Sequence, residues 1–125
     1  MATPHTPESA AAWYANWPGT MNELKSLCPD VARGFGGLFG ATMKDGALTA
    51  LQKELIALGI GLATRCEPCI LAHTQKCLKL GATAEQLQEL AGVAVMMGGG
   101  PVYTYVPTLL AAIEANEVNE APATA

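Results

Sequence analysis

The chain has 125 residues, of which 50% are hydrophobic and only 14% are charged, and its formal net charge is −4. The length fits one domain, and so low a charged share favours an oligomer that buries apolar faces between subunits. No Lys or Arg follows Lys79, so the chain lacks the basic patch expected of a protein that binds nucleic acid or an anionic membrane surface.

Apolar residues recur at helical spacing along almost the whole sequence, and no alternating stretch is long enough to indicate a sheet. We therefore predict an all-α fold. One helical domain would cover residues 1–115, in which residues 1–7 form a loose tail, and residues 116–125 would form a flexible tail after it.

In the first half of the chain, prolines and glycines divide the expected helices. A short helix over residues 8–16 would be ended by Pro18-Gly19, and Thr20 would cap a second helix over 20–27. A proline suits the first turn of the next helix, over 29–44. Four glycines inside that segment weaken a helix in isolation, so tertiary contacts would have to hold it in place.

A helix over residues 49–64 is predicted by a capping box, in which Thr49 is followed three residues later by Gln52. The stretch 55–64 carries no charge. This helix should therefore be buried on nearly every side.

Three further helices are expected. One begins around 66–68, where a proline suits the first turn, and ends at Gly81, a natural left-handed terminator. A second capping box opens a helix over 83–97, and a last helix would run over 101–115 with a bend at Pro107.

No membrane span or signal peptide is expected. Residues 1–20 contain no Lys or Arg and no continuous apolar core. The uncharged stretch 91–113 is long enough to cross a bilayer, but Gly98-Gly99-Gly100-Pro101 and Pro107 interrupt it. We expect buried helices there, and a cytoplasmic protein.

The segment TRCEPCILAHTQKC, residues 64–77, gathers three cysteines and a histidine. Cys66 and Cys69 form a Cys-x-x-Cys pair at a predicted helix start, where they share a face and could bond after a modest adjustment. The amides of a helix N-terminus stabilise a thiolate, which is the attacking form of cysteine. His73 lies one turn beyond Cys69 and is placed to exchange a proton with that sulfur.

Glu54 precedes a run of ten uncharged residues, so its carboxylate could be partly buried and serve as a proton acceptor. In the alternative interpretation, Lys53-Glu54 lies on an exposed first turn, where the helix dipole favours a glutamate. The sequence leaves both open.

Zinc is the main alternative to redox chemistry, because Cys66, Cys69, His73 and Cys77 are all acceptable ligand types. A helix rises about 16 Å between the first and last of these residues, so all four cannot reach one ion. A site made of the first three stays open. Haem attachment is excluded because Ile70, and not histidine, follows the second cysteine.

Cys28 and Cys77 have no partner at motif spacing, and each is interpreted as a small buried hydrophobe. Trp13 and Trp17 are four residues apart and should share one apolar helix face.

The pattern Glu54-x11-Cys66-x-x-Cys69-x-x-x-His73 resembles the alkylhydroperoxidase D family of the carboxymuconolactone decarboxylase superfamily. The likeness covers roughly residues 48–115, including KELIALGIGLATRCEPCILAH and KLGATAEQLQEL. It implies an all-helical trimer or hexamer with its active site near a subunit interface, and thiol-dependent reduction of hydroperoxides.

By the same resemblance, Cys69 would be the attacking thiolate, Cys66 the resolving partner and His73 the proton relay, and Glu54 would act as a base through the histidine or water. The family often has another histidine between the cysteines. Pro68 occupies that position here, so this additional relay group is missing.

The expected partners are a small hydroperoxide and a thiol or dithiol reductant, with no flavin, haem or metal cofactor. Two alternatives remain. The first is lactone decarboxylation, as in the superfamily's namesake enzymes, which generally lack the cysteine pair. The second is a non-enzymatic helical oligomer that senses oxidants or binds zinc.

Overall fold

The computed structural model describes residues 6–120, with side chains described as far as Glu117. Within that range the chain forms seven helices and no strand, which confirms the predicted all-α class. The helices are α1 (Pro7–Leu27), α2 (Pro29–Met43), α3 (Ala50–Ala63), α4 (Glu67–Lys79), α5 (Ala84–Gly98), α6 (Gly100–Tyr103) and α7 (Val106–Glu120).

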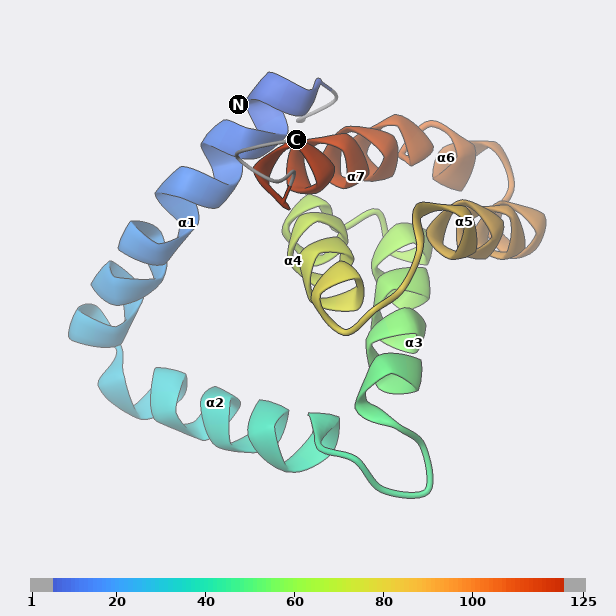
Figure 1. Ribbon diagram of the computed structural model, residues 1–125. Coiled ribbons are helices and arrows are strands. Elements are labelled where there is room, and N and C mark those ends of the chain that lie inside the picture. The colour runs from blue at the N-terminus through green and yellow to red at the C-terminus, as the bar shows by residue number, and fades with distance from the viewer. Residues whose placement is uncertain (1–5, 121–125) are drawn as a thin grey trace.

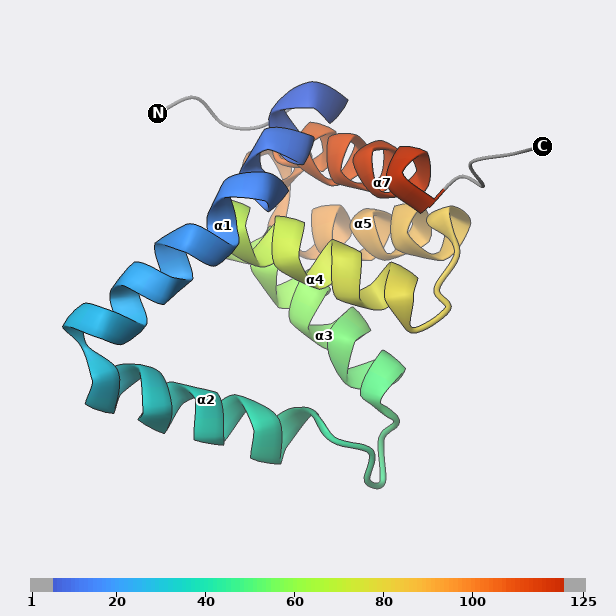
Figure 2. The same cartoon turned by 60° about the vertical axis from the view of Figure 1, so that its left-hand side comes forward.

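The helices form a packed body and a projecting arm (Figures 1 and 2). In the body, α3 packs against α4 and α5, and α7 packs against α4 and the first half of α1. The arm, which we define as residues 18–43, comprises the second half of α1 and all of α2, and it stands away from the body in both views. The loop after α2 returns the chain to the start of α3.

Two apolar clusters hold the body together. The larger lies among α3, α4, α5 and α7 and includes Leu58, Ile70 and Leu109, all fully buried. The smaller lies where α1 meets α4 and α7, and it consists largely of alanines such as Ala10 and Ala112. Small side chains let these helices approach closely, and burial of the larger residues supplies the main driving force for folding.

A half-buried hydrogen-bond network fixes α1 on the body. Tyr14 donates its hydroxyl to the backbone carbonyl of Leu71 (2.5 Å) and accepts from the side-chain amide of Asn116 (3.0 Å). Burial raises the pKa of Tyr14 to about 12, although the hydrogen bond from Asn116 opposes that shift. The phenol therefore stays protonated and keeps donating at neutral pH.

Capping residues set several helix boundaries as predicted. Thr49 with Gln52, and Thr83 with Gln86, form complete capping boxes at the starts of α3 and α5. Gly81 follows α4 with φ +101°, the left-handed conformation that glycine adopts without steric cost. These three predictions are confirmed.

The predicted break at Pro18-Gly19 is wrong, because α1 continues through it to Leu27. Trp13 and Trp17 stack with ring centroids 4.7 Å apart, which confirms their shared face. This stacking stabilises the turn just before the proline, so one missing backbone hydrogen bond does not end the helix.

The ends of the chain also differ from prediction. Helix α1 begins at Pro7, inside the expected tail. The helix expected over 101–115 is divided into α6 and α7, and Pro107 lies in the first turn of α7. Helix α7 runs to Glu120, past the predicted boundary at 115, because Asn116 is buried and bonded to the neighbouring helices. Residues 1–5 and 121–125 of the predicted tails lie outside the described residues.

Within a single protomer, the predictions for the packing of α3 and α2 are not met. Helix α3 is not covered on every side, since Ile56 and Ile60 are 50% and 58% exposed. Helix α2 contains no buried residue, and a Cβ on any of its four glycines would meet no atom within 4 Å, so these glycines do not provide close packing. The tertiary contact predicted for this segment comes instead from Phe39, which meets side chains of α4. None of the helices in the described range has the length and apolar character needed to cross a membrane.

Candidate active site

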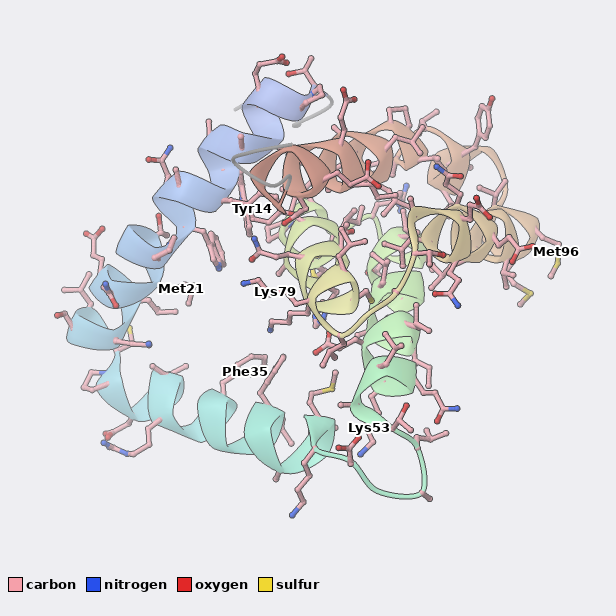
Figure 3. The ribbon with its side chains drawn as sticks, viewed as in Figure 1. Tyr14, Met21, Phe35, Lys53, Lys79 and Met96 are labelled. Atoms are coloured by element: carbon pink, nitrogen blue, oxygen red, sulfur yellow. A yellow bond between two sulfur atoms is a disulfide. The ribbon has the colours of Figure 1, made fainter. Side chains whose placement is uncertain are left out.

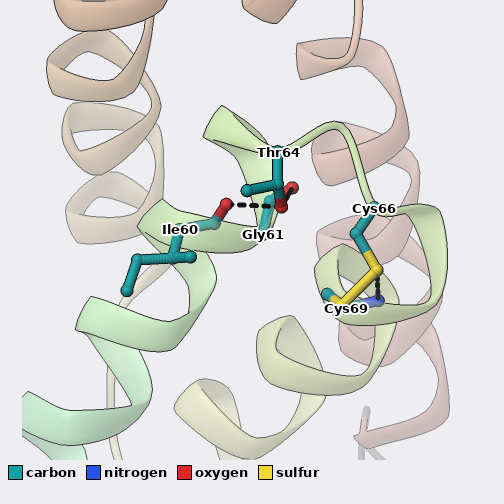
Figure 4. Close-up of a disulfide and its surroundings, with 5 residues drawn as sticks. All are labelled: Ile60, Gly61, Thr64, Cys66 and Cys69. Atoms are coloured by element: carbon teal, nitrogen blue, oxygen red, sulfur yellow. Dashed lines mark hydrogen bonds between the residues drawn. A yellow bond between two sulfur atoms is a disulfide. The ribbon is translucent and has the colours of Figure 1, made fainter.

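Cys66 and Cys69 are joined by a disulfide at the N-terminus of α4 (Figure 4). Cys66 is the N-cap residue, and its sulfur accepts the backbone N–H of Cys69 at 3.4 Å. Pro68 lies in the first turn, where a proline needs no amide hydrogen and its fixed φ suits the helix. The predicted closeness of the two sulfurs is confirmed, with Cα atoms 5.2 Å apart.

A tight connection between α3 and α4 places this disulfide against the body. The hydroxyl of Thr64 donates to the carbonyl of Ile60 at 2.8 Å, which closes the end of α3 (Figure 4). Arg65 then adopts φ +56°, a left-handed conformation uncommon for a residue with a side chain. A Cβ on Gly61 would lie 3.0 Å from the Cβ of Cys69, so a side chain at this crossing would press against Cys69.

His73 and Glu54 form a hydrogen-bonded pair one turn deeper. Nδ1 of His73 lies 2.5 Å from Oε1 of Glu54, and the side chains are 15% and 6% exposed. Glu54 is therefore buried, as the first of the two interpretations expected, and not on an exposed first turn; its role as a proton acceptor stays a prediction. An ionised carboxylate only accepts hydrogen bonds, so with Glu54 ionised Nδ1 would be the donor and Nε2 would be left to exchange a proton with another group.

A cavity of about 440 Å³, open to solvent on one side, lies between the arm and α4. Cys69 and His73 both line it, whereas Cys66 does not, so Cys69 is the cysteine open to a molecule in the cavity. The arm contributes an apolar wall, and Figure 3 shows Met21 and Phe35 on the side of the arm that faces α4. Phe39 stacks on the imidazole of His73, with ring centroids 6.1 Å apart and planes at 20°.

The two remaining cysteines are outside this constellation. Cys77 is fully buried, as predicted, and its pKa is raised to about 12 by burial and, to a smaller extent, by the charge of Glu54. It is therefore a protonated, unreactive thiol at neutral pH. Cys28 is exposed, so the prediction that it is buried is wrong. It lies at the corner between α1 and α2 and belongs to neither apolar cluster.

The observed geometry does not favour a zinc site at the cysteine pair. The sulfurs of Cys66 and Cys69 are bonded to each other. In the described part of the chain, no three His, Cys, Asp or Glu side chains form a group that could hold a metal ion.

Sequence reasoning did not find the walls of the cavity. Phe39 and Lys76 both line it, and they contact each other. Lys76 follows Cys69 by seven residues, or two helical turns, and this spacing was a usable signal. Phe39 had no such signal, because only tertiary packing brings α2 near α4.

A model of the carboxymuconolactone decarboxylase family matches residues 29–115. The chain belongs to this family. The match begins before the resemblance seen in the sequence, and it includes α2, whose residues line the cavity beside Cys69.

Solved structures of carboxymuconolactone decarboxylase family proteins share the fold. A Legionella pneumophila member is 37% identical, with a TM-score of 0.77 and coverage of 89% of this chain and 96% of that one. A Thermotoga maritima member, for which a part in an antioxidative response has been suggested, is 27% identical, with a TM-score of 0.74 and coverage of 86% and 90%.

Two uncharacterised proteins are also similar to this family member. One, from Cupriavidus necator, is 39% identical over 87 residues, which are 70% of this chain and 77% of that protein. Another, from Haemophilus influenzae, is 33% identical over 102 residues, covering 82% and 88%.

Proposed function

We propose that this protein is a thiol-dependent hydroperoxide reductase. One arrangement supports the proposal: Cys69 and His73 lie on successive turns of α4 and line the same cavity, while Cys66 is bonded to Cys69 and Glu54 of α3 holds the imidazole of His73. The suggested antioxidative role of the Thermotoga maritima relative points in the same direction.

The reaction starts from the reduced protein. The thiolate of Cys69 attacks one oxygen of the hydroperoxide ROOH, the O–O bond breaks, and the departing oxygen takes a proton to leave as the alcohol ROH. Cys69 is then a sulfenic acid. The thiol of Cys66 displaces its hydroxyl as water, which forms the disulfide.

His73 and Glu54 supply the proton transfers. Nε2 of His73 would accept the proton of the Cys69 thiol and return one to the departing oxygen. Glu54 holds Nδ1, so it orients the ring and stabilises the imidazolium that forms between these two steps.

The cycle closes when a thiol or dithiol reductant reopens the disulfide by exchange. Two reductant thiols are oxidised to a disulfide for each ROOH converted to ROH and water, so atoms and electrons balance without another cofactor. We place the reaction in the cytoplasm, where thiols are kept reduced.

A thiol count tests this cycle directly. Reduced protein should present four thiols after denaturation, and one equivalent of tert-butyl hydroperoxide should lower that number to two, because Cys66 and Cys69 become bonded. In the folded protein, the exposed Cys28 should react with a thiol reagent, while the buried Cys77 should react only after unfolding.

Peptide mapping of the oxidised sample identifies the bonded pair. A count that stays at four, or a disulfide that includes Cys28, would contradict the proposed cycle.

We also propose that the protein acts as a homo-oligomer, a trimer or a hexamer. Two apolar surfaces support this. The arm exposes Leu27 and Val31, and an open groove of about 590 Å³ between α3 and α5 is flanked by Ile60 and Met97. Exposed apolar surface of this kind is typical of a protein–protein interface.

Light scattering should therefore give a mass three or six times that of the 12.9 kDa chain. Ile60→Glu should lower that mass, because the carboxylate would be desolvated in the interface. A monomeric wild-type protein would overturn this proposal.

A further inference from the structure

The cavity beside Cys69 contains a cation without an anionic partner. Lys76 is half-buried and lines the cavity, and its ammonium lies 4.0 Å from the centre of the Phe39 ring. Among the described residues, no carboxylate forms an ion pair with it. The other lining side chain able to carry a positive charge, His73, is already paired with Glu54.

A purely structural role for Lys76 is the simpler alternative. Both Lys76 and Lys79 lie in the last turn of α4, where a positive charge stabilises the helix dipole. Lys79 is exposed and is not among the residues that line the cavity, so it can serve that role. The dipole therefore does not explain why the other lysine is held over an aromatic ring in the cavity.

The spacing along α4 sets a distance between this cation and the disulfide. Cys69 and Lys76 are seven residues apart, so their backbones share a face and lie about 10 Å apart along the axis, the length of roughly eight carbon–carbon bonds. The wall between them consists of apolar side chains from the arm, such as Phe35 and Phe39. A ligand that fills the cavity would have one reactive end, an apolar middle and one anionic end.

We propose that the substrate is a fatty-acid hydroperoxide whose carboxylate binds Lys76 while its peroxide group reaches Cys69. This inference rests on the proposed peroxidase function and names its substrate class. An apolar chain covers Phe35 and Phe39, and the carboxylate forms a charge-assisted hydrogen bond with the ammonium. Lys76 is then the residue that determines specificity.

The test compares 9-hydroperoxyoctadecadienoic acid with its methyl ester, which has the same peroxide and chain but no charge. With dithiothreitol as reductant and both substrates below their aggregation limit, wild-type kcat/KM should be about tenfold higher for the acid, as expected of a partly exposed charged contact. Lys76→Met should bring the acid-to-ester ratio close to one. Lys76→Arg should preserve it.

Lys44→Met is the matched control, because it removes the same charge from an exposed position that does not line the cavity. It should keep the wild-type ratio. The inference is overturned if wild type consumes acid and ester equally, or if Lys76→Met slows both by the same factor, which would assign the lysine to packing. If wild type consumes neither these substrates nor tert-butyl hydroperoxide, the proposed function itself fails.

Discussion

Replacing Cys69 with serine is expected to reduce hydroperoxide consumption on the order of a thousandfold or more, as losses of a nucleophile in other enzymes do. A serine hydroxyl is a poor nucleophile at neutral pH, whereas a cysteine at a helix N-terminus readily forms the attacking thiolate. Cys69 is also the member of the pair that faces the cavity. Loss of tert-butyl hydroperoxide in the presence of dithiothreitol measures the effect.

Two further cysteine variants make this experiment specific. Cys28→Ser should consume the hydroperoxide at the wild-type rate, because Cys28 is exposed at the corner of the arm. Once pre-reduced and freed of dithiothreitol, Cys66→Ser protein should react once and accumulate a sulfenic acid on Cys69, since no thiol is left to displace its hydroxyl. Undiminished turnover by Cys69→Ser protein would remove the proposed function.

Replacing Glu54 with glutamine is expected to lower kcat by about 10²–10³. The amide has nearly the same shape as the carboxylate but no charge, so it does not stabilise the imidazolium of His73 during proton transfer. The effect should be large because the Glu54 side chain is only 6% exposed and its oxygen lies 2.5 Å from the ring nitrogen. Steady-state kinetics at saturating hydroperoxide provides the measurement.

Glu114→Gln is the control for the loss of one carboxylate, because Glu114 lies exposed on α7. It should leave kcat unchanged. Circular dichroism and thermal unfolding establish that the Glu54→Gln protein remains folded, so that a lower kcat reports on the relay. A folded Glu54→Gln protein with wild-type kcat would show that the pair has no part in proton transfer.

Local signals in the sequence predicted most helix boundaries correctly. The capping boxes at Thr49 and Thr83 and the left-handed Gly81 act through hydrogen bonds and steric limits among residues a few positions apart. The predictions failed where a distant contact overrode the local signal. At Asn116, for example, hydrogen bonds to Tyr14 and Gln75 keep the chain helical beyond the predicted end.

At the disulfide, too, local spacing was predictable from the sequence and distant contacts were not. Helical spacing alone predicted that Cys66, Cys69 and His73 lie on successive turns. The sequence did not decide between a buried and an exposed Glu54, because that depends on how closely α3 approaches α4. A glycine at position 61 allows this approach, since a Cβ there would meet the Cβ of Cys69 at 3.0 Å.

By itself, the sequence determined the helical class and the register of the two sulfurs and the imidazole along α4, because hydrogen bonds within a helix depend only on near neighbours. Tertiary structure alone decided which carboxylate holds His73, and that Phe39 and Lys76 form the cavity beside Cys69. Those contacts join α4 to α3 and α2. They arise from burial of apolar surface across the whole chain, which no local pattern encodes.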